Sequence, residues 1–135
     1  MSNDGFSPFG EKLMMSLELL LDEVIEKWNI PVCRVLAHSD IAPSRKIDPG
    51  VKFDWDRLAI RKLAIKPTML NVKSPNKKSF LTSLGLFGYN TEEPFETLLR
   101  AFRLRFNPLE SGALSVNDTG LAKALSLEYP VDLGV

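Results

Sequence analysis

The first apolar pattern of the chain has the period of an α-helix and extends from residue 8 to about residue 29. Ser7 followed by Pro8 is typical of a helix start, because serine caps helix N-termini and proline is tolerated in the first turn. The acidic side chains fall outside the apolar face, which argues against a helix lying on a membrane surface. The pattern predicts an amphipathic helix whose packed face carries Leu13, Leu17, Leu20, Leu21, Val24 and Trp28.

A short strand is predicted after this helix. Ile30 and Pro31 end the helical pattern, and residues 33–37 then alternate in the manner of a β-strand. This alternation places Cys33 on the face opposite to His38, so we interpret the thiol as a small apolar filler and not as a metal ligand. Because Cys33 is the only cysteine, the chain cannot form an internal disulfide.

The remaining patterns predict helices only. Asp54 is a good N-cap for a helix that begins near residue 55, and residues 66–76 lose periodicity and contain prolines, as a linker does. Three short helices are then expected, the second over 94–106 and the third from Asn117 or Asp118. We therefore expect two units, residues 1–65 and residues 77–135, joined by the linker 66–76.

Composition removes several classes of function. The chain has 135 residues, with 17 basic and 17 acidic side chains and a formal net charge of zero, so nothing favours broad binding to nucleic acid. Its apolar runs are too short to span a membrane. The first residues also lack the basic and apolar regions of a signal peptide.

The chemistry of the sequence is concentrated in residues 38–50. His38 is the only histidine, Asp48 follows it ten positions later, and a Pro-Gly turn comes next. Imidazole nitrogen and carboxylate oxygen are suitable ligands for zinc. Lys46 would place a positive charge near a substrate bound to such a metal, whereas Asp40 is better interpreted as an acceptor that stabilises the loop.

The stretch His38-Ser39-Asp40-Ile41-Ala42-Pro43-Ser44-Arg45-Lys46-Ile47-Asp48-Pro49-Gly50 resembles the metal loop of the zinc-dependent N-acetylmuramoyl-L-alanine amidases of the type 2 family. The resemblance implies that His38 and Asp48 are two zinc ligands and that Lys46 is catalytic, stabilising the tetrahedral intermediate. It also implies hydrolysis of the amide between N-acetylmuramic acid and L-alanine in peptidoglycan. The expected fold is α/β: part of an amidase domain made of helix, short strand, zinc loop and helix, followed by a small all-α domain.

The tail resembles the helical peptidoglycan-binding domain that follows the amidase domain in some members of this family. The resemblance rests on residues 84–90 and 99–106 and implies that Tyr89 and Arg103 contact a glycan ligand. The alternative is a packing module without affinity for glycans, since a fold does not by itself establish a function.

The family resemblance also implies that a further zinc-ligand histidine and a catalytic acid lie upstream of the matched stretch. Three explanations are open: the other part of the amidase is a separate chain, the chain is a remnant that only binds peptidoglycan or muropeptide, or it is a truncated product. We expect exposed apolar surface on residues 8–29 and hence self-association. Family members with this tail suggest the bacterial cell envelope or periplasm, with the cytoplasm as the alternative.

Overall fold

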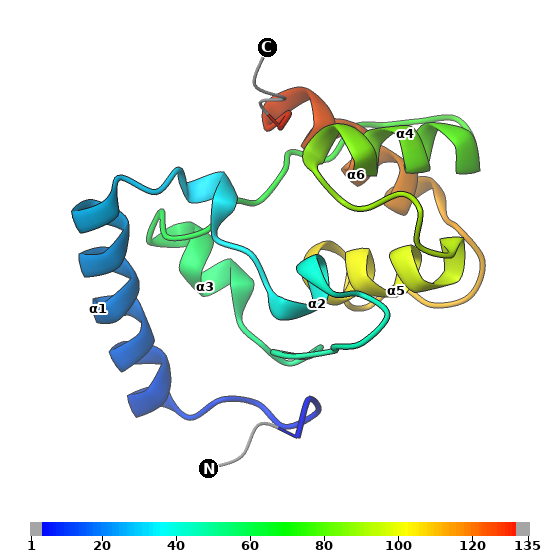
Figure 1. Ribbon diagram of the computed structural model, residues 1–135. Coiled ribbons are helices and arrows are strands. Elements are labelled where there is room, and N and C mark those ends of the chain that lie inside the picture. The colour runs from blue at the N-terminus through cyan, green and yellow to red at the C-terminus, as the bar shows by residue number, and fades with distance from the viewer. Residues whose placement is uncertain (1–3, 132–135) are drawn as a thin grey trace.

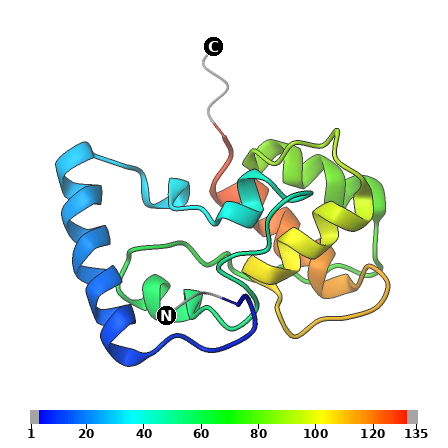
Figure 2. The same cartoon turned by 60° about the horizontal axis from the view of Figure 1, so that its bottom comes forward.

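The computed structural model describes residues 4–131, and every regular element in that range is helical (Figure 1). The turned view in Figure 2 shows that α1 stands apart on one side and that the last three helices gather on the other. In chain order the elements are α1 (Glu11–Trp28), the 3₁₀-helix η1 (Val32–Arg34), α2 (His38–Ile41), α3 (Trp55–Ile60), α4 (Lys77–Phe87), α5 (Phe95–Phe106) and α6 (Val116–Glu128).

The expected α/β fold was wrong. No β-strand occurs within residues 4–131, and the segment predicted as a strand instead forms η1 followed by Val35 in an extended conformation (φ −81°, ψ 100°). The physical reason is that a strand needs a neighbour for its backbone hydrogen bonds. The described residues supply no such neighbour, and the amides of Arg34 and Val35 donate to carbonyls three residues earlier.

Helix α1 begins three residues later than predicted, and only part of the predicted face packs: Leu17 and Leu21 lie against the core, as expected. Its N-cap is Gly10, whereas the carboxylate of Asp4 accepts from the amides of Phe6 and Ser7 before the helix starts. Its core contribution comes from Met14, which joins Leu58, Leu63 and Ala64 in a small cluster. Three members of the predicted packed face are exposed instead: Leu13, Leu20 and Trp28.

An ion-pair network fastens α1 to α3. Glu18 is buried, and its carboxylate accepts from Arg57 Nε at 2.5 Å. The same guanidinium donates from Nη1 to Glu11 at 2.7 Å. The hydrogen bond from Arg57 and the positive charge of Arg57 lower the pKa of the Glu11 carboxyl. The hydrogen bond from Arg57 also lowers the pKa of the Glu18 carboxyl. Arg57 thereby holds α1 on α3 at two positions, Glu11 and Glu18.

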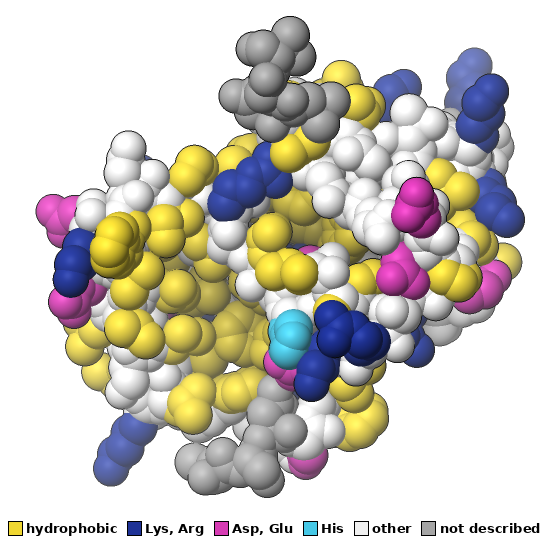
Figure 3. Space-filling model, in the orientation of Figure 1, with side chains coloured by type: hydrophobic (Ala, Val, Ile, Leu, Met, Phe, Trp, Pro, Cys, Tyr) yellow, Lys and Arg dark blue, Asp and Glu magenta, His cyan; other side chains and the backbone are white. Residues whose placement is uncertain are grey.

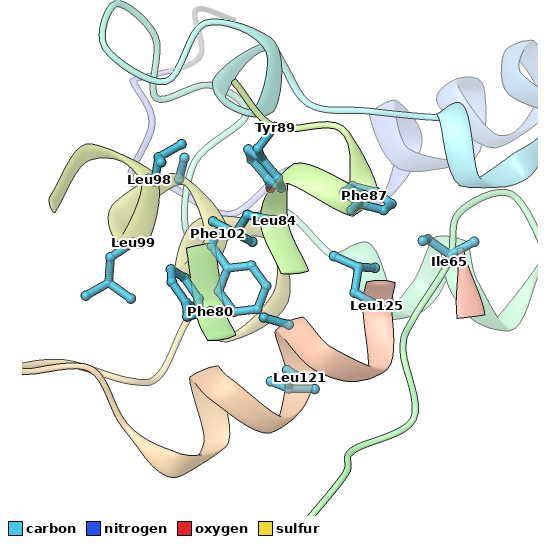
Figure 4. Close-up of a cluster of buried hydrophobic side chains, with 12 residues drawn as sticks. Ile65, Phe80, Leu84, Phe87, Tyr89, Leu98, Leu99, Phe102, Leu121 and Leu125 are labelled. Carbon is cyan, nitrogen blue, oxygen red and sulfur yellow. The ribbon is translucent and has the colours of Figure 1, made fainter. Parts of the chain in front are cut away.

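The main core lies between the last three helices. Fully buried aromatic rings from two of them meet edge to face, with Phe80 and Phe102 centroids 5.2 Å apart (Figure 4). Helix α6 adds Leu121 and Leu125 to the same cluster. The predicted helix 94–106 is confirmed to within one residue, and α6 begins with a capping box in which Ser115 and Asp118 bond reciprocally.

The predicted linker is packed along α6. Pro67 is buried, the amide of Thr68 donates to Glu128, and the amide of Asn76 donates to Thr119. Gly120 permits this approach, because a Cβ built there would lie 2.1 Å from the carbonyl oxygen of Leu70. Residues 66–76 are therefore tied to the helix, and the division into two domains stays a prediction.

Helix α1 presents an apolar surface that the described residues leave open. Figure 3 shows a hollow lined by hydrophobic side chains between α1 and the rest of the molecule. The exposed part of α1, here called the α1 apolar surface, consists of Leu13, Met15, Leu19, Leu20 and Trp28, with exposed fractions from 39% to 69%. The expectation of exposed apolar side chains on the N-terminal segment is confirmed; self-association stays a prediction.

Candidate functional site

The loop predicted to hold a metal begins with a helical turn and closes on itself. Helix α2 places His38 at its first position, and the amide of Ser39 donates to the carbonyl of Asp48 at 3.1 Å. This backbone bond brings the two ends of the loop together. As a result, His38 Nδ1 lies 3.2 Å from Asp48 Oδ2.

The far end of the loop is fixed by backbone geometry. The Asp48–Pro49 peptide bond is cis, and Gly50 has φ +94°. A Cβ at Gly50 would lie 2.1 Å from the carbonyl oxygen of Gly5, so the N-terminal segment comes close to the turn at a position where only glycine fits.

The paired side chains remain accessible. The side chains of His38 and Asp48 are 48% and 45% exposed. Figure 3 shows the imidazole at the surface beside a group of basic side chains. Lys46 is exposed on the same loop, and within residues 4–131 its ammonium makes no ion pair.

The described residues supply two metal donors at this place and no third. Two ligands of a tetrahedral zinc, at about 2.0–2.2 Å from the ion, lie roughly 3.3–3.5 Å apart. The separation of 3.2 Å between His38 Nδ1 and Asp48 Oδ2 is close to that value, and the donor types suit zinc. Within residues 4–131, however, no group of three or more His, Cys, Asp or Glu side chains could hold an ion.

Asp40 is a loop-stabilising acceptor, as predicted, and its partners come from two parts of the chain. Its Oδ2 accepts from the amide of Ala37 at 2.8 Å, and its Oδ1 accepts from the hydroxyl of Tyr89 at 2.5 Å. Burial raises the pKa of the Asp40 carboxyl, and these two hydrogen bonds oppose the rise. Burial and the neighbouring carboxylate raise the pKa of Tyr89 well above its ordinary value.

A buried arginine that the sequence analysis did not single out completes this cluster. Arg105 is 4% exposed, and its Nε lies 3.9 Å from Asp40 Oδ2. Its guanidinium also stacks over the ring of Trp55 at 3.5 Å. Burial lowers the pKa of Arg105 to about 10, so the side chain remains charged at neutral pH. The helical pattern of residues 94–106 placed it off the apolar face, and no signal in the sequence indicated its burial.

The two residues predicted to contact a glycan have internal partners. Tyr89 is 6% exposed and donates to Asp40. Arg103 donates from Nη2 to Asp118 at 2.6 Å and from Nη1 to the carbonyl of Gly112 at 2.7 Å. The structure therefore places Tyr89 beside the loop and Arg103 between α5 and α6, and it does not bring the two together. Contact with a glycan stays a prediction for both.

The sequence is similar to two bacterial amidases. The N-acetylmuramoyl-L-alanine amidase AmiD of Escherichia coli strain K12 is 30% identical over 143 residues, covering 94% of this chain and 52% of AmiD. The 1,6-anhydro-N-acetylmuramyl-L-alanine amidase AmpD of Haemophilus influenzae is 41% identical over 51 residues, covering 37% of this chain and 28% of AmpD. No family profile matches the sequence.

Solved structures agree with these relatives. The complex of E. coli AmiD with anhydro-N-acetylmuramic acid-L-Ala-D-γ-Glu-L-Lys matches with a TM-score of 0.83 and 31% identity, over 92% of this chain and 55% of that chain. AmpDh3 of Pseudomonas aeruginosa, in complex with anhydromuramic pentapeptide, matches with a TM-score of 0.82 and 27% identity, over 97% of this chain and 59% of that chain.

The resemblance inferred from the loop is thus confirmed by sequence and by structure. The chain spans about half the length of AmiD, and its helical arrangement is that of the corresponding part of the solved amidases. In sequence and in fold the chain is similar to N-acetylmuramoyl-L-alanine amidases over this part of their length.

Proposed function

We propose that this chain provides the metal loop of a zinc-dependent N-acetylmuramoyl-L-alanine amidase, which cleaves the amide between N-acetylmuramic acid and L-alanine in peptidoglycan or a muropeptide. The observation that carries the proposal is the approach of His38 Nδ1 to Asp48 Oδ2 at 3.2 Å on an accessible loop. The names of the relatives and the muropeptide ligands in two matched structures support the substrate class.

His38 and Asp48 would hold the zinc, which when bound supplies Lewis acidity at the scissile carbonyl. His38 Nδ1 and Asp48 Oδ2 lie 3.2 Å apart, so the fold of the loop brings the two donors together. Lys46 lies two residues before Asp48 and has no carboxylate partner among the described residues. Its ammonium is therefore available to stabilise negative charge on the amide oxygen, a contribution of roughly 100-fold or more in rate where a donor is preorganised.

Catalytic zinc usually has three protein ligands, so this proposal requires one more from outside the described residues. We infer that the missing ligand is carried by another polypeptide segment, in a longer chain or in a separate one, that packs on the α1 apolar surface. The open hollow beside α1 and the coverage of only 52% of AmiD support this. An apolar partner surface would bury the exposed side chains of α1.

A second function has one observation in its favour. Because no three-donor cluster occurs within residues 4–131, the alternative is a module that binds peptidoglycan without cleaving it. The two functions differ in their need for zinc.

Zinc content tests the proposal. Because the described residues supply two of the usual three ligands, we expect weak zinc binding by the native sequence, measured by elemental analysis after equilibration with excess zinc, and its loss in His38→Ala and in Asp48→Asn. Asp56→Asn is the matched control, because Asp56 is an exposed aspartate paired only with Lys66 in the described structure. A ratio near one zinc per two chains would indicate that two copies share the ion.

The activity arm uses release of peptide from a muropeptide, with Lys46→Ala as the catalytic variant. Zinc binding that is unaffected by His38→Ala would refute the assignment of the ligands. Absence of zinc even with the metal in excess, together with sedimentation on insoluble peptidoglycan, would refute the amidase proposal and support the binding module.

A further inference from the structure

The loop that carries His38 and Asp48 is joined to the C-terminal helices by contacts between residues far apart in the sequence. Tyr89, in the connection between α4 and α5, donates to Asp40, 49 residues earlier. On α5, Arg100 Nη2 donates to the carbonyl of Pro43 at 2.8 Å, and Arg105 lies against Asp40. The loop is thus held from one side by the helical unit, a name used here for α4, α5, α6 and their connections, residues 77–128.

Asp40 links the helices to the segment that carries His38. Its Oδ2 accepts from the amide of Ala37, the residue directly before His38. Helix α2 has only four residues, and so short a helix is not stable alone in water. The orientation of His38 must therefore be imposed by contacts outside α2, and the buried carboxylate of Asp40 is where those contacts converge.

Arg105 has hydrogen-bonding capacity that the described structure does not use. Its Nε and Nη2 are buried and have no hydrogen-bond partner. Nε lies 3.9 Å from Asp40 Oδ2, so an approach of about 1 Å would bring the two atoms to hydrogen-bond distance. The stack of Arg105 on Trp55 keeps the guanidinium at this place. The buried arginine thus lies within ion-pair distance of Asp40.

We propose that Tyr89 and Arg105 are positioning residues for the His38–Asp48 pair, and that they act through Asp40. The helical unit then has a role in the metal site itself, independent of any affinity for glycans. The inference rests on the proposed function in one respect, because it takes His38 and Asp48 as the zinc ligands. The positioning role requires neither Tyr89 nor Arg105 to touch metal or substrate.

Hydrogen exchange of the full chain tests the positioning without any metal. The amides of Ser39, Ala42 and Lys46 are hydrogen-bonded within the loop and should exchange slowly. Tyr89→Phe removes only the hydroxyl that binds Asp40, and we expect these amides to exchange about tenfold faster or more. Tyr129→Phe is the matched control, because it changes the only other tyrosine of the chain and should leave the loop unaffected.

A role confined to general stability would change the exchange of the whole helical unit. We expect instead that amides of the α4 and α5 core keep their protection in Tyr89→Phe. Equal loop protection in Tyr89→Phe and in the native sequence would overturn the proposal, as would an equal loss throughout the core. Should Tyr89→Phe fail to fold, Asp40→Asn tests the same link, with the same expected increase in loop exchange.

The second readout is the imidazole of His38, which is the only histidine and gives unambiguous ring signals in NMR. We expect titration with Zn²⁺ to shift these signals and Tyr89→Phe to weaken the apparent affinity about tenfold. A ring that does not respond to Zn²⁺ in the native chain would refute the proposed function, whereas the exchange measurement would still decide whether Tyr89 positions the loop. An affinity that Tyr89→Phe leaves unchanged would overturn the positioning role.

Discussion

Replacement of Asp118 by alanine should destabilise the helical unit by about 3–4 kcal/mol. Asp118 is fully buried at the start of α6, and three groups donate to its carboxylate: Arg103 Nη2 at 2.6 Å, Asn107 Nδ2 at 2.9 Å and the Ser115 amide at 3.0 Å. Loss of one partner from a buried ion pair costs about 3–5 kcal/mol. Arg103 keeps two carbonyl acceptors, at Gly112 and Ala113, which favours the lower part of this range.

The measurement is the free energy of unfolding from urea denaturation, together with the melting temperature, which should fall by roughly 10–15 °C in Asp118→Ala. Asp56→Ala is the control, since this exposed aspartate pairs with Lys66 at the surface and should cost less than about 1 kcal/mol. An Asp118→Ala variant no less stable than Asp56→Ala would refute the reasoning.

The Asp118 carboxylate should also make the stability of the protein depend on pH. Burial alone would raise the pKa of Asp118, but the hydrogen bonds from Arg103, Ser115 and Asn107 hold it below its ordinary value of 3.8. The unfolded chain therefore binds the proton more readily than the folded one. Its stabilisation is fully present above about pH 4 and is lost as the pH falls through the folded pKa. Asp118→Asn should flatten this acid limb of the stability curve, and an unchanged limb would contradict the assignment.

Two further outcomes follow from packing. Gly120→Ala should destabilise the chain by about 1–3 kcal/mol in urea denaturation, because the new Cβ would meet the carbonyl of Leu70. The better helix propensity of alanine does not offset this clash. In the control Gly10→Ala, a Cβ meets nothing within 4 Å, and the variant should cost only about 0.5 kcal/mol. Leu20→Lys should reduce self-association measured by light scattering without lowering the melting temperature, whereas the same charge at Ser111, which is exposed between α5 and α6, should not. A native chain that is monomeric at high concentration would contradict this.

Local signals in the sequence predicted most helix starts and indicated which residues of the loop 38–50 come together. His38 and Asp48 were paired from their spacing in a known pattern, and the structure brings them to 3.2 Å. Asp54 was predicted to cap a helix, and its side chain does accept from the Arg57 amide. Such features depend on a few neighbouring residues, so a sequence pattern contains nearly all the information they require.

Features that depend on distant partners could not be predicted in the same way. The strand at residues 33–37 was wrong because alternation indicates a strand only where a neighbouring strand exists to pair with it. The hydroxyl of Tyr89 reaches Asp40 across 49 residues, and periodicity contains no information about such a contact. The face of α1 that packs was predicted only in part, at Leu17 and Leu21, since helix α1 is apolar on more than one side and burial of Met14 depends on where α3 lies.

The place of α6 in the chain has a consequence for synthesis. Helix α6 is the last helix of the described residues, and yet Leu121 and Leu125 form one wall of the core around Phe80 and Phe102. A nascent chain leaves the ribosome from its N-terminus, so α4 and α5 are in solution with their aromatic face uncovered until α6 has been made. Premature termination before α6 should therefore yield a product that chaperones retain or that aggregates, and folded protein should appear only once α6 has left the ribosome.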